Sequence, residues 1–356
     1  MKIALVHDYL NEAGGAERVL RVLAEMYPKA PIYTAFAKRG SARGMFFDRK
    51  IVESPWAWFL KIGRMYSYCR FLLPWIWGSV DLTAYDFVIT SCSGYIARGF
   101  KVRKDAKVIA YCHTPPRWLY GYDTPTGAQG RWWGRVFMWI VGPFMRYFDF
   151  RSAERVNVWI ANSQEVARRI EKFYRKKSTI VYPPVEMLDS RLQTPVSRGN
   201  YYLMISRIVG GKGILEAVRA FKKLGLQLKI VGEVVDKRLG EKIDYMGRVD
   251  DAELAGLYAG AKGFVALARD EDFGMTVVES MLCGTPVLAY KAGGYLESVV
   301  PGKTGVFVEG TSAKVIGGGI KQMEKTKWKR EEIREWASRF GRANFEKNIR
   351  KLVEKI

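Results

Sequence analysis

Short apolar runs alternate with helical patterns along almost the whole chain, and this alternation limits the folds that it can adopt. In the first half, the strand-like runs cover residues 3–7, 32–35, 87–90, 108–112, 158–161 and 179–182. Helical spacing of apolar residues occupies many of the gaps, including 16–26 and 164–173. Strands that alternate with helices in this way are typical of a parallel sheet covered by helices.

A polar stretch at residues 186–200 interrupts the alternation once and predicts a linker. Beyond it the strand-like runs resume, at 202–206, 227–231, 243–246 and 263–266, with helical patterns between them. A chain of 356 residues also exceeds the size at which one core usually stops growing. We therefore expect an α/β protein with two doubly wound, Rossmann-like domains facing a cleft, and ligands beyond the carboxyl ends of the strands.

The composition indicates a folded protein of a reducing compartment. Hydrophobic residues make up 48% and charged residues 26% of the chain, as in globular proteins. The four cysteines are scattered without paired spacing, and the chain has only two histidines, so we expect neither a disulfide framework nor a metal site. Met1 and Lys2 lead directly into the first strand-like run, which argues against a signal peptide and favours the cytoplasm.

The chain is strongly basic, and most of the excess lies in the first half. The formal net charge is +22, of which residues 1–200 contribute +15 and residues 201–356 contribute +7. A nucleic acid, an anionic membrane surface or a phosphorylated acceptor would each match this charge. A solvated basic surface without a partner, as in proteins from hot habitats, is the alternative.

Two stretches, at residues 55–77 and 131–146, combine basic residues with many aromatic ones. Their uninterrupted apolar runs are shorter than the roughly 20 residues that span a bilayer. Both can lie in the membrane interface, with tryptophans at headgroup depth and basic residues on phosphates. Core helices whose basic side chains snorkel are the alternative. The candidate membrane or acceptor contacts are Trp56, Trp58, Arg117, Trp118, Trp132 and Trp133.

Glu271 and Glu279 stand on either side of Gly274, at which a loop is expected to become a helix. Backbone amides and the helix dipole at such a point favour an anion. A sugar joined to a nucleotide diphosphate needs amides for its phosphates and a carboxylate at each end for its hydroxyls. The pair is therefore a candidate ligand site, and an amphipathic helix with two solvated glutamates is the alternative.

Other strand ends also carry candidate residues. Gly14 and Gly15 open a helix after the first strand-like run, without the G-x-G-x-x-G spacing of a dinucleotide site. His113 follows the fourth run, where a histidine is structural about as often as functional. Arg207 and Lys212 follow the first run of the second half, where a guanidinium and an ammonium can hold phosphate. A surface Arg/Lys pair is the alternative.

These motifs occur in a fixed order. They are Gly14-Gly15, Arg207-x4-Lys212, Gly247-Arg248-Val249, Glu271-x7-Glu279 and Cys283-Gly284-Thr285-Pro286. The ordered set resembles the retaining, nucleotide-sugar-dependent glycosyltransferases of family four, over nearly the whole chain. A narrower resemblance, to bacterial and archaeal mannosyltransferases of surface-polysaccharide assembly, rests on residues 7–10, 14–19, 111–115, 160–163 and 181–184.

The resemblance implies a fold and a division of the chain. Family members have two Rossmann-like domains, the glycosyltransferase B-type fold, and their last helix crosses back to the first domain. The implied parts are 1–190, an acceptor-binding and membrane-facing domain, 191–335, a nucleotide-sugar-binding domain, and 336–356, the returning helix. That last segment carries an apolar stripe that needs a partner, formed by Phe345, Ile349, Leu352 and Val353.

The resemblance also implies roles for single residues. Arg207 and Lys212 would neutralise the donor diphosphate and the charge that grows on it, which can replace a metal. Glu271 would hold sugar hydroxyls, Glu279 would hold the ribose hydroxyls, and His113 would lie by the sugar and the acceptor oxygen. The other donor contacts would be Gly14, Gly15, Arg248 and Val249, together with the backbone of Phe273, Gly274, Met275 and Thr276.

The expected function is transfer of a hexose from a nucleotide-sugar to a membrane-associated, lipid-linked glycan, with retention and without a cofactor or metal. The narrower resemblance favours mannose from GDP-mannose and a protein bound peripherally to the inner face of the cell membrane. A double displacement would require a carboxylate close beneath the anomeric carbon, and no residue is an obvious candidate. The resemblance implies front-face attack instead, with the departing diphosphate accepting the proton of the acceptor.

Three other functions fit parts of the pattern. They are a basic nucleic-acid-binding protein, a nucleotide-sugar epimerase, and the same transferase fold using a UDP-sugar on a different acceptor. The ordered motifs argue against nucleic acid as the partner. They do not fix the oligomeric state.

Overall fold

The computed structural model describes residues 2–38, 40, 44–63, 65–122, 132–186, 199–207, 211–234 and 245–356, except for the side chain of Trp133. Among these residues, those up to Pro184 together with Ala343–Ile356 form one compact unit, here unit 1. The described residues of Val185–Arg342 form a second, unit 2. The polar stretch predicted as a linker lies largely outside the described residues, because these do not include 187–198.

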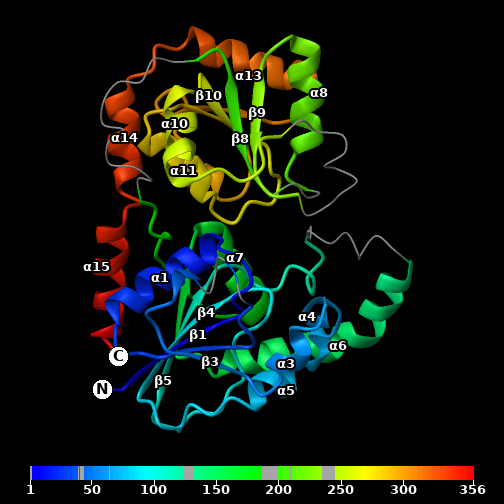
Figure 1. Ribbon diagram of the computed structural model, residues 1–356, viewed down its shortest axis with the longest axis vertical. Helices are drawn as coiled ribbons and strands as arrows, with labels where there is room; N and C mark the ends of the chain where they lie inside the picture. Colours follow the sequence, from blue (N-terminus) through cyan, green and yellow to red (C-terminus); the bar gives the residue numbers. More distant parts are fainter. Residues whose placement is uncertain are drawn as a thin grey trace. The chain divides into compact units, whose positions relative to one another are not determined.

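In the described part of unit 1, seven parallel strands form one sheet in the order β3-β2-β1-β4-β5-β6-β7 (Figure 1). Sequence order reverses between β1 and β4, where His7 pairs with Ser91. Ligand sites of such sheets form beyond the carboxyl ends of the strands, at the reversal. The strands are β1 (Ile3–His7), β2 (Ile32–Thr34), β3 (Ile51–Glu53), β4 (Phe87–Cys92), β5 (Lys107–Cys112), β6 (Val158–Ala161) and β7 (Thr179–Ile180).

Alternate residues of the central strands enter two different buried clusters, as the pleat of a strand requires. Ala4 and Val6 of β1 lie in one cluster, and Leu5 lies in the other. Val88 and Ile89 of β4 divide in the same way. The sheet is therefore buried on both faces, which is why its strands read as continuous apolar runs.

Helices cover both faces of this sheet. The first cluster takes residues from α3 (Ala57–Leu60), α5 (Leu73–Gly78), α6 (Trp132–Glu154) and α7 (Gln164–Tyr174). The second takes residues from α1 (Gly15–Met26) and α15 (Arg342–Val353). The short elements α4 (Met65–Tyr68) and η1 (Arg70–Leu72) lie between α3 and α5 in the chain.

The last helix, α15, belongs to unit 1 from Ala343 onward, although the stretch directly before it, Val185–Arg342, belongs to unit 2. Phe345 and Ile349 are buried in the second cluster, and Leu352 and Val353 pack against it. The ring of Phe345 lies 5.7 Å from that of Tyr111 on β5, between centroids. The prediction that the C-terminal helix returns to the first domain is confirmed.

Unit 2 contains a second parallel sheet, in the order β12-β11-β10-β8-β9. Sequence order reverses here between β8 and β10. The strands are β8 (Tyr202–Ile205), β9 (Leu228–Val231), β10 (Gly263–Ala266), β11 (Val287–Tyr290) and β12 (Gly305–Val308). The helices are α8 (Ile214–Leu224), α10 (Asp251–Gly260), α11 (Met275–Leu282), α12 (Tyr295–Ser298), α13 (Ala313–Lys325) and α14 (Arg330–Ser338).

The expected fold class is confirmed, and the predicted strands agree with the observed ones to within two residues, apart from the run at 243–246. Residues 243 and 244 lie outside the described part of the chain, and Tyr245 and Met246 are not in a strand. Three strands were not predicted, β3, β11 and β12. They have three or four residues each, as do the predicted strands β2 and β6, so their length does not explain why they were missed.

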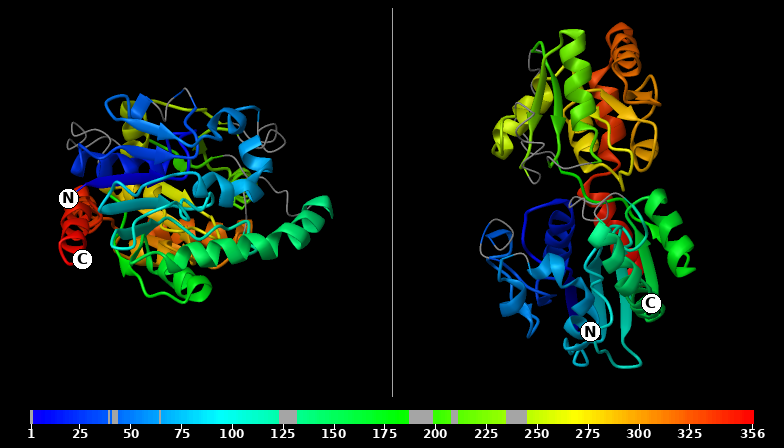
Figure 2. Two further views of the ribbon diagram at one scale, coloured as in Figure 1. Left: turned by 90° about the horizontal axis from the view of Figure 1, so that it is seen from below. Right: turned by 90° about the vertical axis from the view of Figure 1, so that its right-hand side faces the viewer.

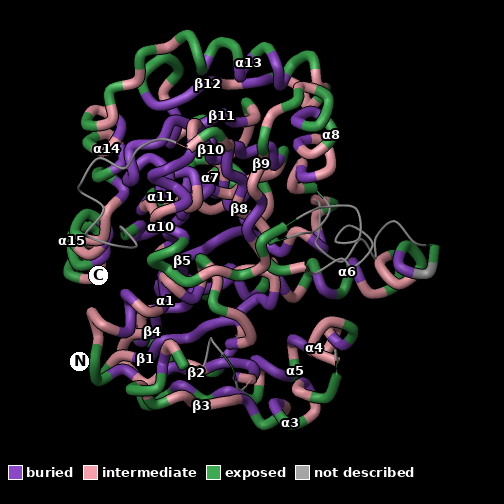
Figure 3. The backbone as a smooth tube through the Cα atoms, turned by 45° about the horizontal axis from the view of Figure 1, so that its top comes forward, coloured by how far each residue is buried: buried purple, intermediate pink, exposed green. Residues whose placement is uncertain are grey.

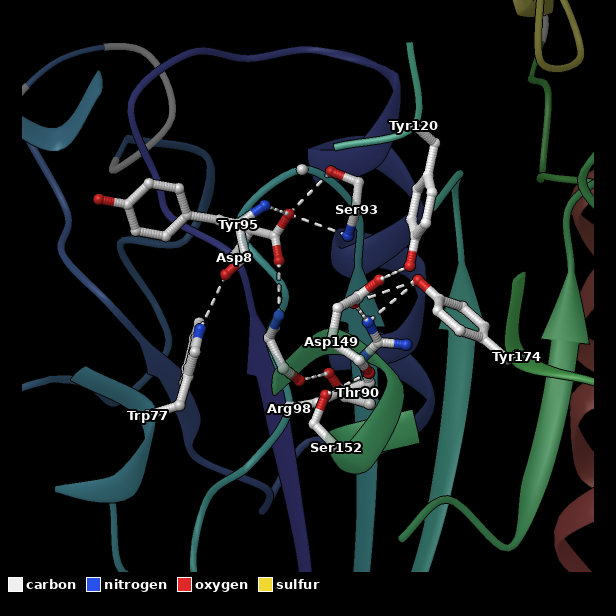
Figure 4. A network of polar contacts seen from close by, with 12 residues as sticks. Asp8, Trp77, Thr90, Ser93, Tyr95, Arg98, Tyr120, Asp149, Ser152 and Tyr174 are labelled. Atoms are coloured by element: carbon white, nitrogen blue, oxygen red, sulfur yellow. Dashed lines mark hydrogen bonds and ion pairs between the residues drawn. The ribbon is translucent and has the colours of Figure 1, made fainter. Parts of the chain in front are cut away.

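A buried carboxylate at the end of β1 holds the loop that follows β4 (Figure 4). Asp8 accepts hydrogen bonds from the backbone amides of Ser93, Tyr95 and Ala97, at 2.9 to 3.0 Å. The hydroxyl of Ser93 adds a fourth, at 2.7 Å. The loop therefore has a fixed course beside the carboxyl ends of β1 and β4.

A second buried carboxylate, Asp149, anchors α6 (Figure 4). It forms an ion pair with Arg98, whose side chain is also buried. The hydroxyl of Tyr120 donates to Asp149 at 2.7 Å, and that of Tyr174 on α7 donates at 3.2 Å. Burial is the main reason why the pKa of Asp149 is raised, and Arg98 and the two hydroxyls oppose the shift. One carboxylate thus links α6 to α7 and to the segment after β5.

Candidate functional site

In unit 2, the predicted residues gather where sequence order reverses between β8 and β10. Lys212 follows β8 and Glu271 follows β10. The Lys212 ammonium lies 2.8 Å from Glu271 Oε2, and both side chains are partly exposed. The hydroxyl of Tyr295, at the start of α12, lies 3.5 Å from the same oxygen. The sheet topology therefore joins two residues that are 59 positions apart.

Gly274 precedes the first turn of α11 and has a left-handed conformation, with φ of +87°. A Cβ atom at this position would lie 2.6 Å from Cε1 of Tyr295, so only glycine fits both the backbone and the space. The amides of Met275 and Thr276, in the first turn, have no acceptor within the helix. Together with the helix dipole, they make this end of α11 suitable for an anion.

Glu279 lies inside α11, and only 4% of its surface is exposed. The hydroxyl of Tyr258, on α10, donates to Glu279 Oε2 at 2.7 Å. The Glu279 carboxylate is therefore held in place, unlike that of a solvated surface glutamate. Tyr258 was not among the predicted site residues.

The other predicted cations of unit 2 are exposed. Arg207 lies two residues after the end of β8. Arg248 forms an ion pair with Glu233, and the neighbouring Val249 is half-buried. An exposed ion pair of this kind adds little to stability, so Arg248 can exchange its partner for a ligand.

In unit 1, the predicted residues gather beside the reversal between β1 and β4. The amide of Gly14 donates to Glu17 Oε2 at 3.0 Å, and Gly15 is the first residue of α1. Burial opposes ionisation of Glu17, but hydrogen bonds from His7 and from backbone amides outweigh it and lower the pKa of this carboxyl. Glu17 is therefore an anion at neutral pH.

His113 directly follows β5 and is buried. Its Nε2 lies 2.8 Å from the hydroxyl oxygen of Ser91 on β4. The Asn162 side-chain amide donates to the His113 carbonyl at 2.9 Å, which fixes the backbone. Sequence reasoning did not select Ser91, because the contact arises from the pairing of β4 with β5.

The predicted aromatic contacts divide into exposed and buried residues. Trp58 and Trp132 are 71% and 74% exposed, and Trp56 is half-buried. Trp118 is only 7% exposed, and its indole N–H donates to the Gly94 carbonyl at 2.8 Å. Trp118 is thus part of the core of unit 1, next to the half-buried Arg117. The side chain of Trp133 lies outside the described residues.

Helix α6 exposes an apolar stripe, here the α6 stripe. Its spacing is that of one helical face. The helix extends away from the sheet of unit 1 (Figure 2), and exposed or partly exposed residues dominate its outer half (Figure 3). Arg135 and Arg146 are exposed on the same helix. The stripe consists of Trp132, Val136, Trp139, Ile140, Phe144 and Tyr147.

The α6 stripe has an aromatic neighbour on α5. The ring of Trp75, itself exposed, lies 6.0 Å from that of Phe144, between centroids. No helix in the described part of the chain has the length and apolar character needed to cross a bilayer. An apolar face that points to solvent is unusual for a surface helix of a globular protein and typical of an interaction surface.

Two family profiles match the chain in succession. One, described as Glycosyltransferase Family 4, matches residues 13–187, and the other, described as Glycosyl transferases group 1, matches residues 190–340. The chain belongs to the family-four glycosyltransferases. The resemblance stated from the motifs is thereby confirmed. Family four is a family of retaining hexosyltransferases that use nucleotide-sugars.

Curated relatives match the chain only in part. An uncharacterised glycosyltransferase of Methanocaldococcus jannaschii is 24% identical over 225 residues, which cover 59% of this chain and 63% of that protein. The lipopolysaccharide core biosynthesis mannosyltransferase LpcC of Rhizobium leguminosarum bv. viciae is 34% identical over 92 residues, 26% of each chain. The chain therefore spans less than two thirds of the length of these curated relatives.

Solved structures of glycosyltransferases match over the full length. HepE of Anabaena, in complex with UDP-glucose, superposes with a TM-score of 0.70 at 18% identity, covering all of both chains. At this identity the likeness concerns the fold alone. It identifies the two sheets as those of the glycosyltransferase B-type fold.

Proposed function

We propose that the protein is a metal-independent, retaining mannosyltransferase that uses GDP-mannose and a lipid-linked glycan at the inner face of the cell membrane. The observation that carries this proposal is the Lys212–Glu271 pair near the N-terminal turn of α11. A cation, a carboxylate and backbone amides are the groups that a sugar joined to a diphosphate requires.

In this function, donor binding breaks the Lys212–Glu271 pair. Lys212 would move from the carboxylate to the diphosphate, and Glu271 would then accept hydrogen bonds from sugar hydroxyls. Arg207 would supply the second cation. Negative charge grows on the diphosphate as the glycosidic bond breaks, and two cations with the amides of α11 would stabilise it.

Retention would follow from attack on the face that the diphosphate leaves. The acceptor hydroxyl oxygen forms the new bond to the anomeric carbon while the bond to the diphosphate breaks. The proton of that hydroxyl passes to an oxygen of the departing diphosphate. No enzyme carboxylate needs to form a covalent intermediate, so Glu271 can serve to hold the sugar.

Glu279 would bind the ribose hydroxyls of the donor. Its orientation by Tyr258 supports this role, since an ordered carboxylate accepts two hydroxyls with less loss of entropy than a mobile one. A buried carboxylate that meets the ribose would also distinguish the nucleotide from a free sugar phosphate.

The α6 stripe and its arginines support a membrane-bound acceptor. Tryptophan and tyrosine favour the depth of the lipid headgroups, and arginine favours their phosphates. Trp139 is 80% exposed, which leaves its full ring available for a bilayer surface. The net charge of +22 adds attraction to anionic lipids.

The test is a donor screen with a lipid-linked sugar acceptor, read by mass spectrometry. We expect the acceptor to gain the mass of one hexose with GDP-mannose, and the product to keep the anomeric configuration of the donor. The Glu271→Ala variant serves as the inactive control. Release of free sugar without any acceptor product, from every donor, would contradict the proposal.

A second candidate is transfer from a UDP-sugar, because the similar HepE structure contains UDP-glucose. The same screen separates the two. A hexose gain with UDP-glucose and none with GDP-mannose would replace the donor in the proposal and leave the site unchanged.

A further inference from the structure

The only two histidines of the chain belong to one buried row of polar groups in unit 1. Glu17 Oε1 of α1 lies 3.5 Å from Nε2 of His7, the last residue of β1. Nδ1 of His7 lies 3.0 Å from the Ser91 hydroxyl oxygen on β4. The same oxygen lies 2.8 Å from Nε2 of His113. The row crosses three adjacent strands at the carboxyl edge of the sheet.

The chemistry of the first group, together with a neutral imidazole at His7, sets the direction of the row. An ionised carboxylate only accepts hydrogen bonds, so Glu17 requires a proton on Nε2 of His7. A neutral His7 then accepts at Nδ1, and the Ser91 hydroxyl must donate to it. The Ser91 oxygen is left as an acceptor, which requires a proton on Nε2 of His113. Each step follows from the one before, because a neutral imidazole has one donor and one acceptor.

We propose that Glu17, acting through His7 and Ser91, holds His113 in the tautomer that carries its proton on Nε2 and its lone pair on Nδ1. Glu17, His7 and Ser91 are positioning residues. Since Glu17 also accepts a hydrogen bond from the Gly14 amide, one carboxylate orders both the glycine loop and His113. The use of the lone pair, to accept a hydrogen bond from a sugar or acceptor hydroxyl, rests on the function proposed above.

The direct test is nuclear magnetic resonance of the full-length protein with ¹⁵N-labelled histidine. Long-range correlations between ring nitrogens and ring protons show which nitrogen carries the proton, and two imidazoles give a simple spectrum. A His7→Gln variant assigns the two signals. In the wild type we expect both rings to carry their proton on Nε2. A His113 protonated on Nδ1, or a cationic His7, would overturn the proposal.

The Glu17→Gln variant provides the sharpest comparison. Its amide oxygen can still accept from Gly14, while its NH₂ group takes the place of the oxygen that faces His7. That group donates, so His7 must accept at Nε2 and the whole row reverses. We expect both histidines to move their proton to Nδ1. Unchanged tautomers would overturn the proposal. Glu25→Gln, on the same helix, is the matched control and leaves both tautomers as in the wild type.

The Ser91→Ala variant cuts the row without changing Glu17. We expect His7 to keep its proton on Nε2, and His113 to lose its single tautomer. Adding Glu17→Gln to this variant should then reverse His7 alone. A His113 that stays fully protonated on Nε2 without Ser91 would overturn the proposal. Thermal melting identifies any variant that fails to fold. If Glu17→Gln fails to fold, the tautomers in Ser91→Ala test the proposal in its place.

Activity gives a second readout. In a donor and acceptor assay we expect Glu17→Gln to lower kcat more than it raises the donor KM, because the phosphate-binding groups remain. The tautomer measurement needs no substrate. An experiment that rejects the proposed function can therefore be distinguished from one that rejects the proposed tautomer of His113.

Discussion

Each of the two glutamates in the unit 2 site is held by a neighbouring side chain, and the two contacts differ in strength. Lys212 holds Glu271 through a partly exposed ion pair, which water and salt weaken. Tyr258 holds Glu279 through a buried hydrogen bond, which water and salt do not weaken. We infer that the first contact is exchangeable and the second is permanent. This difference is consistent with the proposed roles, in which Glu271 binds and releases the donor sugar in each turnover while Glu279 keeps its position.

The Tyr258→Phe variant removes only the hydroxyl that orients Glu279. A hydrogen bond to a charged group contributes about 1.5–3 kcal/mol, and part of it stabilises the bound nucleotide, so we expect the Kd for GDP to rise several-fold. Isothermal titration calorimetry measures the change. Glu279→Ala should weaken binding further.

The matched control is Tyr202→Phe, which removes a hydroxyl that donates to Glu324 in the same unit, at 3.1 Å. It should leave the Kd unchanged. If Glu279→Ala lost turnover while the donor Kd stayed constant, Glu279 would act in the reaction and not in ribose binding.

Sequence motifs were enough to locate Lys212, Glu271 and Glu279, because their residue types and spacing are characteristic. They were not enough for Tyr258, which meets Glu279 only when α10 packs against α11. Nor did they indicate that Ser91 joins the two histidines, since that contact depends on strand order. Partners brought together by topology leave no local pattern in the sequence.

At the scale of elements, α6 combines a firm anchor with an exposed apolar face. Asp149 ties the helix to Arg98, Tyr120 and Tyr174, while the α6 stripe points to solvent. The sequence predicted an aromatic and basic segment here, and it left open whether that segment is core or interfacial. Burial separates the two parts, since Met145 and Asp149 are buried and Trp139 is exposed.

The α6 stripe predicts binding to anionic membranes. The wild type should sediment with liposomes that contain an acidic phospholipid, and a Trp132→Ser/Trp139→Ser double variant should largely remain in the supernatant. Phe47→Ser, which changes another strongly exposed aromatic residue of unit 1, is the control and should sediment like the wild type. Undiminished sedimentation of the double variant would reject the role of the stripe.

The Arg98–Asp149 pair predicts a specific pattern of stability. Removing one partner, as in Arg98→Met, leaves a buried charge and should cost about 3–5 kcal/mol. Replacing both, as in Arg98→Met/Asp149→Leu, removes that charge and should recover much of the loss. Thermal melting of the three proteins checks this order. A double variant that is less stable than Arg98→Met alone would contradict it.

At the scale of the whole molecule, the chain forms two α/β units. Each has a sheet of parallel strands with one reversal of strand order. The alternating pattern predicted both sheets, and the apolar stripe of Phe345 and Ile349 predicted that the last helix needs a partner. The short strands β3, β11 and β12 escaped prediction, because only their neighbours in the sheet make them strands.

In the proposed function, unit 2 binds a nucleoside diphosphate through the cations that follow β8, of which Lys212 pairs with Glu271. The most direct measurement is the melting temperature of the wild type with GDP, UDP or ADP. A ligand at about 100 times its Kd stabilises a protein by about 2.7 kcal/mol, so we expect a clear rise with GDP. The rise should shrink in Arg207→Ala and Lys212→Ala and persist in Lys314→Ala, an exposed cation on α13. If none of the three nucleotides raised the melting temperature of the wild type, unit 2 would not be a nucleoside diphosphate site.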